Sequence, residues 1–200
     1  MHKAIIFDLG KVLIPFDFSR VYQELETYTH HPAAEIRRRI AATGLVEPLE
    51  KGLIEPRDFV AQLCAAAELG IDYDDFCRLW SCIFVGQLIP DRVLESLAAR
   101  YRLLLLSNTN RIHFEMIRQK YPMLEHFDDF VLSFEVHAMK PEPAIYREAI
   151  SRAGCRPGEC FYTDDIGDFV EAARREGIDA VQFESAAQLE REMAARGIAW

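Results

Sequence analysis

The sequence predicts an α/β protein in which a doubly wound parallel sheet carries an inserted all-helical domain. Residues 4–7 and 103–106 are uninterrupted apolar runs, which is typical of strands buried on both faces of a parallel sheet. From Pro90 onward, helical and strand patterns alternate, which implies right-handed crossovers between parallel strands. Residues 18–84 show only helical patterns, so we expect them to form a separate insert.

The expected elements follow from the local pattern. Pro15 interrupts regular structure after the first strand, and the first insert helix has Ser19 as a possible cap. Further insert helices are expected to begin at Pro32, Pro56 and Asp72. Beyond the insert we expect helices at 90–100, 111–120, 143–153, 167–176 and 186–196, and strands at 102–107, 130–133, 160–164 and 178–182.

The composition limits the class of protein. The 200 residues suffice for one core domain, 1–16 with 88–200, and a helical insert, 17–87. The formal net charge of −9 and the lack of a basic stripe argue against nucleic-acid binding. The basic run Arg37-Arg38-Arg39 fans around a helix and is typical of a solvated face.

The cysteines and the N-terminus bear on the compartment. Five cysteines occur without a CxxC spacing, which predicts neither a zinc site nor a disulfide framework. The N-terminus lacks the charged and apolar regions of a signal peptide, and no apolar run approaches the roughly 20 residues that span a bilayer. We therefore expect a cytoplasmic protein with reduced thiols that does not bind membranes, as a monomer or homodimer.

Polar side chains gather where the expected strands end. Asp8 follows the first strand, Ser107-Asn108 the second and Asp164-Asp165 a later one, while Lys140 precedes the helix expected at Pro143. Ligands of open α/β sheets bind outside the carboxyl ends of the strands, so we expect these side chains to converge. A carboxylate, an ammonium group and an acidic pair suit phosphoryl transfer assisted by Mg²⁺, which prefers hard oxygen ligands.

These segments, FDLGKV, LLSNTN, KPEPAIY and YTDDIGD in that order, resemble the four motifs of the haloacid dehalogenase-like (HAD) hydrolase superfamily. The chain is most similar to the branch that includes glucose-1-phosphate phosphatases, and the resemblance covers the whole chain. It implies a Rossmann-like core with a helical cap domain. It also implies a phosphatase that acts on a small phosphorylated metabolite.

The resemblance also implies roles for individual residues. Asp8 would be the nucleophile, forming an aspartyl-phosphate, and would ligate the metal together with the backbone carbonyl of Gly10. Ser107 and Asn108 would hold the phosphoryl oxygens by a hydroxyl and a backbone N–H, and Leu9 and Gly10 would adjoin the phosphate. Lys140 would lie between Asp8 and the phosphate and offset their repulsion.

The acidic pair indicates a metal without reference to any family. Adjacent carboxylates such as Asp164 and Asp165 repel each other and are costly to hold together unless a cation is present. By the motif, Asp165 would ligate Mg²⁺ directly and Asp164 through water or as a supporting group. Asp168 would support Lys140 or a metal-bound water, or else cap the following helix.

Gly10 departs from the common pattern of the family. Most phosphatases of the superfamily carry a second aspartate there as general acid and base, and such catalysis is typically worth about 10²–10⁴-fold in rate. Anomeric sugar 1-phosphates, which have a more acidic leaving hydroxyl, would tolerate the loss best. Asp17 could be a substitute acid, although a hinge carboxylate paired with Arg20 is the interpretation that we favour.

Three functions remain open at this stage. The leading one is a Mg²⁺-dependent phosphomonoester hydrolase acting on a sugar phosphate. The second is a 2-haloacid dehalogenase, which needs no metal, and the third is a catalytically weak domain that binds phosphorylated metabolites. Specificity would come from cap residues within 44–54, with Glu47 and Lys51 as candidates to contact a sugar, whereas His113 and His137 receive no role.

Overall fold

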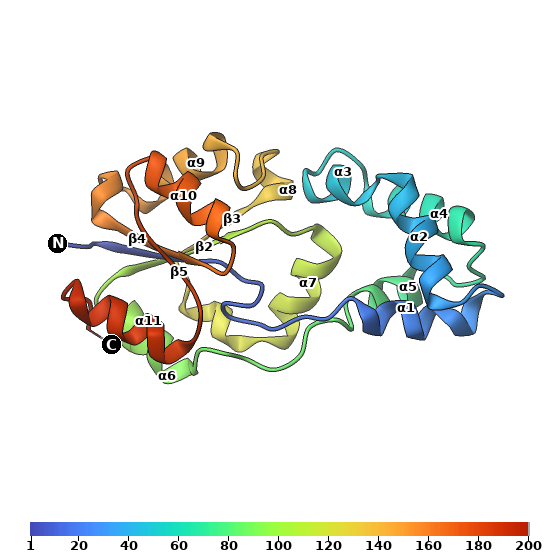
Figure 1. The fold of residues 1–200 in the computed structure, drawn as a ribbon, viewed down its shortest axis with the longest axis horizontal. Coiled ribbons are helices and arrows are strands. Elements are labelled where there is room, and N and C mark those ends of the chain that lie inside the picture. Colours follow the sequence, from blue (N-terminus) through green and yellow to red (C-terminus); the bar gives the residue numbers. More distant parts are fainter. Residues whose placement is uncertain (200) are drawn as a thin grey trace.

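The computed structural model describes residues 1–199 and contains one sheet of five parallel strands (Figure 1). The strand order is β3-β2-β1-β4-β5, so β1 is central and lies between β2 and β4. Its last residue, Phe7, is in register with Leu105 of β2 and Thr163 of β4. The predicted doubly wound α/β core is thereby confirmed. The strands are β1 (Ala4–Phe7), β2 (Arg102–Ser107), β3 (Asp129–Leu132), β4 (Cys160–Asp164) and β5 (Asp179–Gln182).

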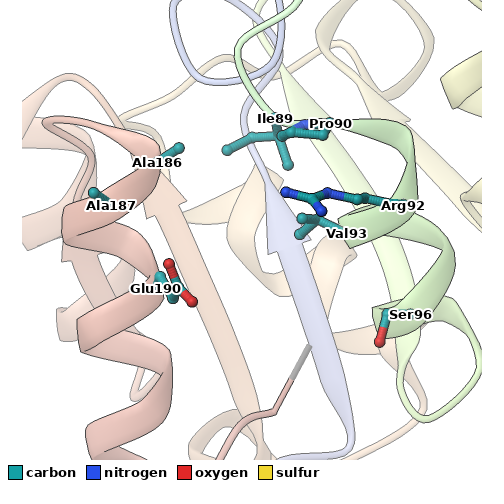
Figure 2. Close-up of a pocket in the computed structure, with 8 residues that line it drawn as sticks. All are labelled: Ile89, Pro90, Arg92, Val93, Ser96, Ala186, Ala187 and Glu190. Atoms are coloured by element: carbon teal, nitrogen blue, oxygen red, sulfur yellow. The ribbon is translucent and has the colours of Figure 1, made fainter.

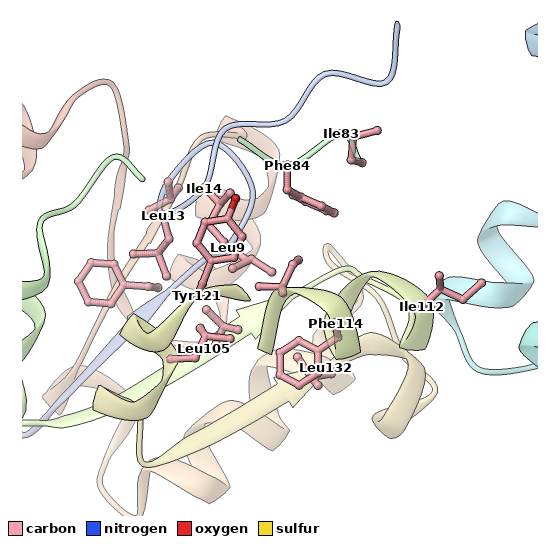
Figure 3. Packing of buried hydrophobic residues seen from close by; sticks show 14 of the residues in the cluster. Leu9, Leu13, Ile14, Ile83, Phe84, Leu105, Ile112, Phe114, Tyr121 and Leu132 are labelled. Atoms are coloured by element: carbon pink, nitrogen blue, oxygen red, sulfur yellow. The ribbon is translucent and has the colours of Figure 1, made fainter. Parts of the chain in front are cut away.

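Two hydrophobic cores form because successive side chains of each strand point to opposite faces. In β1, Ile5 and Phe7 belong to the larger core, and Ala4 and Ile6 to the smaller one. Figure 3 shows part of the larger core near the ends of the strands. The larger core is covered by α6 (Asp91–Ala98), α7 (Arg111–Lys120) and α11 (Ala186–Ala195), and the smaller by α9 (Pro143–Ala153) and α10 (Gly167–Arg175).

The helices of the insert lie apart from the sheet, beyond the carboxyl ends of its strands (Figure 1). Their buried apolar side chains are continuous with the larger core and include Trp80, whose ring stacks on Phe76 with centroids 5.5 Å apart. The helices are α1 (Ser19–Leu25), the 3-10 helix η1 (Glu26–Tyr28), α2 (Ala33–Thr43), α3 (Val46–Glu50), α4 (Pro56–Ala67) and α5 (Tyr73–Trp80).

Two linkers, 15–18 and 83–88, join the insert to the core and run side by side. The Asp17 N–H donates to the Ile83 carbonyl at 3.1 Å, and the Val85 N–H donates to the Pro15 carbonyl at 3.1 Å. These bonds hold the two connections together between the insert and the sheet.

Several details differ from the sequence-based expectation. Ser19 lies inside α1 and does not cap it; instead, the carboxylate of Asp17 accepts hydrogen bonds from the Ser19 N–H and hydroxyl at 2.8 and 2.7 Å. Four short helices were not expected, because each is too short to show a periodic pattern. They are α3, η2 (Pro122–His126), α8 (Ser133–Val136) and η3 (Pro157–Glu159). Within residues 1–199, no helix combines the length and apolar character that crossing a bilayer requires.

Candidate active site

Three carboxylates meet at the carboxyl edge of the sheet. Asp8 directly follows β1, Asp164 ends β4 and Asp165 follows it, and one oxygen from each lies within 4.8 Å of the others. This proximity follows from the topology, since β1 and β4 are hydrogen-bonded neighbours whose ends are in register. The structure therefore brings together the residues that the strand-end argument selected.

Lys140 is buried among these carboxylates, with 4% of its surface exposed. Its Nζ donates to Asp8 Oδ1 at 2.6 Å, to Asp164 Oδ2 at 2.7 Å and to the Leu106 carbonyl at 3.2 Å. Burial alone would lower the pKa of Lys140, but the two carboxylates outweigh it and raise the pKa above its ordinary value. The ammonium is therefore a fixed positive charge at the centre of the site.

Even with Lys140 beside it, the surroundings of Asp8 disfavour its ionised form. Burial raises its pKa to about 7, an effect that Lys140 opposes and the neighbouring charge of Asp164 reinforces. A nucleophilic carboxylate must be ionised, so a further positive charge beside it would favour the reactive form.

The two members of the acidic pair differ in their environment. Asp164 is fully buried, and both its oxygens accept hydrogen bonds: Oδ2 from Lys140 and the Tyr162 hydroxyl, Oδ1 from the Ile166 N–H at 2.9 Å. Asp165 is only partly buried, and its carboxylate makes no hydrogen bond or ion pair with residues 1–199. Burial and Asp164 raise the pKa of Asp165.

The Asn108 side chain positions Lys140. Its Oδ1 accepts from the Lys140 N–H at 2.8 Å, and its Nδ2 donates to the Lys140 carbonyl at 3.0 Å. Two opposed bonds to one peptide segment fix where the lysine leaves the backbone. The side chain of Asn108 is therefore committed to Lys140, so only its backbone N–H could serve a phosphate. Ser107 is buried beside it, with 2% exposure.

The donor set fits a hard divalent cation. It consists of carboxylate oxygens from Asp8 and Asp165 with the backbone carbonyl of Gly10 nearby in sequence, and it contains no sulfur or imidazole. Asp164 adds negative charge behind this set while its oxygens hold Lys140. Mg²⁺ is the cation whose chemistry matches these ligands.

Two of the expected supporting residues lie elsewhere. Asp168 is exposed on the first turn of α10 and makes no bond to Lys140, whose three donors are satisfied by other groups; its link to a metal-bound water stays a prediction. Asp17 is exposed and bound by Ser19, whose hydrogen bonds lower the pKa of Asp17. The expected ion pair with Arg20 is not present among residues 1–199.

The cap segment 44–54 contacts the core at its rim. Lys51 Nζ pairs with Glu47 and with Glu142 of the core, each at 3.0 Å, and the Lys51 carbonyl accepts from His137 Nδ1 at 2.8 Å. Both residues expected to contact a sugar are therefore engaged in the junction between cap and core. His137, which the sequence left without a role, helps to hold that junction.

A cavity of about 80 Å³ lies between the strand ends and the cap. The core contributes Gly10 and Ser107 to its wall, and the cap contributes Glu50, a residue that the sequence analysis did not single out. His113 also lines it; its Nδ1 accepts from the Asn110 amide and its Nε2 donates to the Trp80 carbonyl. Burial lowers the pKa of His113 to about 4, so this histidine is a neutral strut between α7 and the cap.

A larger cavity, about 520 Å³, opens between α6 and α11 (Figure 2). Its lining includes Ile89, Val93 and Ala186, with Arg92 and Glu190 as the charged members. None of the predicted site residues lines it. The smaller cavity is lined by Leu9, Gly10, Ser107 and Asn108 of the predicted site, and the carboxylate cluster with Lys140 lies outside its lining.

Comparison with known proteins agrees with this geometry. Residues 2–177 match the family model of haloacid dehalogenase-like hydrolases. The chain is 30% identical to a protein named phosphatase MT3486 from Mycobacterium tuberculosis over 88% of this chain and 85% of the relative. It is 25% identical to D-ribitol-5-phosphate phosphatase from Bacteroides thetaiotaomicron over 96% and 97% of the two chains.

The fold is shared with a solved HAD family enzyme from Bacteroides thetaiotaomicron, crystallised with magnesium and inorganic phosphate. The two structures superpose with a TM-score of 0.81 and 27% sequence identity, covering 93% of this chain and 96% of that one. With the family model spanning most of its length, this chain belongs to the haloacid dehalogenase-like hydrolases.

Proposed function

We propose that the protein is a Mg²⁺-dependent phosphomonoester hydrolase that acts on a small phosphorylated metabolite through an aspartyl-phosphate at Asp8. The observation that carries the proposal is the cluster at the sheet edge: three carboxylates within 4.8 Å and one buried ammonium among them. The negative charge exceeds what Lys140 alone offsets, and a divalent cation would balance it.

The residues divide the work between them. Asp8 attacks phosphorus, and Lys140, held by Asn108 and Asp164, fixes one Asp8 oxygen and neutralises charge on the phosphoryl group. The Ser107 hydroxyl and the Asn108 N–H would bind phosphoryl oxygens. When bound, Mg²⁺ supplies positive charge to the nucleophile and the phosphoryl oxygens. The carboxylate of Asp165 has no partner among residues 1–199, and this supports Asp165 as the direct ligand of the metal.

The relatives support the same chemistry. Two of the similar proteins are named phosphatases, and the Bacteroides enzyme was crystallised with both magnesium and phosphate. A cytoplasmic location and a monomeric or homodimeric state stay predictions.

The dehalogenase alternative is less favoured by the acidic pair. A metal-free displacement of halide gives no function to Asp165, a carboxylate without a protein partner beside two others. Gly10 remains compatible with that chemistry, so the experiment below distinguishes the two.

For the substrate we propose a sugar phosphate, with an anomeric sugar 1-phosphate as the favoured case. The support is Gly10: with no acid at this position, an ester whose leaving hydroxyl has a lower pKa depends least on a proton donor elsewhere in the cavity. On this proposal glucose 1-phosphate is hydrolysed at least as fast as glucose 6-phosphate. Far faster turnover of glucose 6-phosphate would rule it out.

The decisive experiment is a panel of phosphate esters assayed with Mg²⁺ and with EDTA, using the wild type and Asp8→Asn. Asp58→Asn, at an exposed position on α4, is the matched control. We expect phosphate release that requires Mg²⁺, disappears in Asp8→Asn and persists in Asp58→Asn. EDTA-insensitive chloride release from 2-haloacids would indicate a dehalogenase instead. Mg²⁺ binding without turnover on any ester would indicate a binding protein.

A further inference from the structure

The cavity at the sheet edge has one acidic side chain that nothing in the protein satisfies. Glu50, the last residue of α3, lines it together with Gly10 and Ser107. Its carboxylate makes no hydrogen bond and no ion pair with any residue in 1–199. Glu50 is half-buried, and with no protein partner its carboxyl group is free to exchange a proton with a molecule bound in the cavity.

A side chain at position 10 would require the Phe16 ring to move. A Cβ built on Gly10 would lie 2.7 Å from Cε1 of Phe16, closer than real Cβ contacts come. The Phe16 ring, which also packs against Phe84, fills the space that a side chain at position 10 would enter. A proton donor for the leaving oxygen must therefore come from another wall of the cavity.

Glu50 is the candidate on that other wall. The second ionisable side chain in the lining is His113, and both its ring nitrogens are already engaged, with Asn110 and Trp80. The aromatic residues Phe16, Phe18 and Phe84 also line the cavity, so part of the wall that Glu50 shares is apolar.

We propose that Glu50 is the general acid and base of the phosphatase reaction, in place of the aspartate that Gly10 lacks. The inference rests on the function proposed above. In the first step Asp8 bonds to phosphorus, the bond from phosphorus to the alcohol oxygen breaks, and the Glu50 carboxyl gives its proton to that oxygen. In the second step the Glu50 carboxylate takes a proton from water. The oxygen of that water bonds to phosphorus, and the bond between Asp8 and phosphorus breaks. Phosphate leaves and Glu50 is protonated again.

The electrostatic surroundings of Glu50 agree with this role. Burial, reinforced by the charge of Glu47, raises the pKa of Glu50 to about 7, where a group can both give and take a proton near neutral pH. Lys51, the cationic residue that follows Glu50 in the chain, is paired with Glu47 and Glu142. Among the other groups on this side of the molecule, His113 of α7 is neutral, and the charges of Asp8 and Lys140 pair with each other.

The test compares Glu50→Gln with the wild type on two kinds of ester. An alkyl phosphate needs a proton on its leaving oxygen, whereas p-nitrophenyl phosphate releases an anion that is stable near neutral pH. For Glu50→Gln we expect kcat on the alkyl ester to fall by roughly 10²–10⁴-fold, as loss of acid–base help implies. Glu24→Gln, an exposed position on α1, is the control and should keep wild-type rates.

The aryl ester separates proton transfer from a structural effect. Glu50→Gln should still release a burst of about one nitrophenol per active site and then stall, with phosphate trapped on Asp8, because the water in the second step lacks its base. The wild-type rate on the alkyl ester should also decline above about pH 7, and that decline should be absent from the residual activity of Glu50→Gln.

The outcomes are distinguishable. If Glu50→Gln hydrolyses the alkyl ester with the same kcat as the wild type, the assignment of Glu50 is wrong. It is also wrong if Glu50→Gln gives no nitrophenol burst, because Glu50 would then be needed for a step other than proton transfer. If the wild type itself releases no phosphate with Mg²⁺, the proposed function fails, and the assignment of Glu50 fails with it.

Discussion

The Nζ of Lys140 lies 2.6 Å from Oδ1 of Asp8, although 132 residues separate them in the chain. The same Nζ lies 2.7 Å from Oδ2 of Asp164, so one ammonium joins the ends of β1 and β4. This arrangement orients the nucleophile, and the same buried ion pairs contribute to the stability of the core domain.

Replacing Lys140 with alanine should therefore affect both activity and stability. We expect kcat/KM to fall at least about tenfold, because charge stabilisation of the phosphoryl group is lost. Removing one partner of a buried ion pair should also cost on the order of 3–5 kcal/mol in the free energy of unfolding. Denaturant melts and steady-state assays measure the two effects. Lys3→Ala, which removes an exposed lysine paired with Glu159, should change neither by much. An equally mild effect of Lys140→Ala would remove Lys140 from the site.

Asn108→Ala tests the clamp on the Lys140 backbone. Losing two partly buried hydrogen bonds should lower the free energy of unfolding by about 1–3 kcal/mol, and kcat should fall because Lys140 is no longer held in place. Mg²⁺ affinity, measured by calorimetry, should stay close to that of the wild type, because the Asn108 side chain contacts no proposed ligand. A kcat equal to that of the wild type would show that the clamp does not position the lysine.

Gly52→Ala tests the contact between cap and core. A Cβ there would lie 2.1 Å from the carbonyl oxygen of Phe134, a backbone atom that cannot move aside cheaply. Gly154 has a similar positive φ, +67° against +65°, but nothing within 4 Å of its Cβ position, so Gly154→Ala shares the backbone strain without the clash. We expect kcat/KM to fall at least about tenfold in Gly52→Ala alone, because the cap can no longer pack against the core at Phe134. Equal effects in both variants would contradict this.

The pKa of Asp8 gives the dependence of metal binding on pH. Burial raises that pKa from 3.8 to about 7, so the metal-free folded protein holds a proton near pH 6 that the unfolded chain has released. The stability that Asp8 contributes therefore decreases as the pH rises from 3.8 to about 7 and the folded protein loses this proton. Mg²⁺ requires the ionised form, so its stabilising effect should be greater at pH 8 than at pH 6. Thermal melts with Mg²⁺ and with EDTA at both pH values measure it, and a larger effect at pH 6 would refute the assignment of Asp8 as a ligand.

The core of the site was predictable because it depends on topology. Parallel strands end at one edge, so Asp8 and Asp164-Asp165 had to meet once their strands were recognised. The helix that follows Lys140 was predicted with its observed bounds, Pro143–Ala153, because proline and glycine mark its two ends.

What the sequence could not reveal depends on the orientation of the cap. Glu47 and Glu50 lie on a helix of five residues, and Lys51 directly follows it. The helix is too short for a periodic pattern to identify an inner face. Which of them faces the cavity is set by contacts distant in sequence, such as the one between Lys51 and Glu142. The bonds from Asn108 to the Lys140 backbone, across 32 residues, are equally invisible to a local pattern.

The small volume of the chamber at the sheet edge has a consequence for turnover. The cavity has a volume of about 80 Å³, whereas pockets for small molecules typically have about 300–1,000 Å³, so we expect a hexose to enter only when the helical lobe moves away from the sheet. On such a substrate we expect each catalytic cycle to include an outward movement of the helical lobe about the paired connections at 15–18 and 83–88. We expect this swing to limit the rate for bulky esters, which would make kcat fall with solvent viscosity for a hexose phosphate and much less for a two-carbon ester.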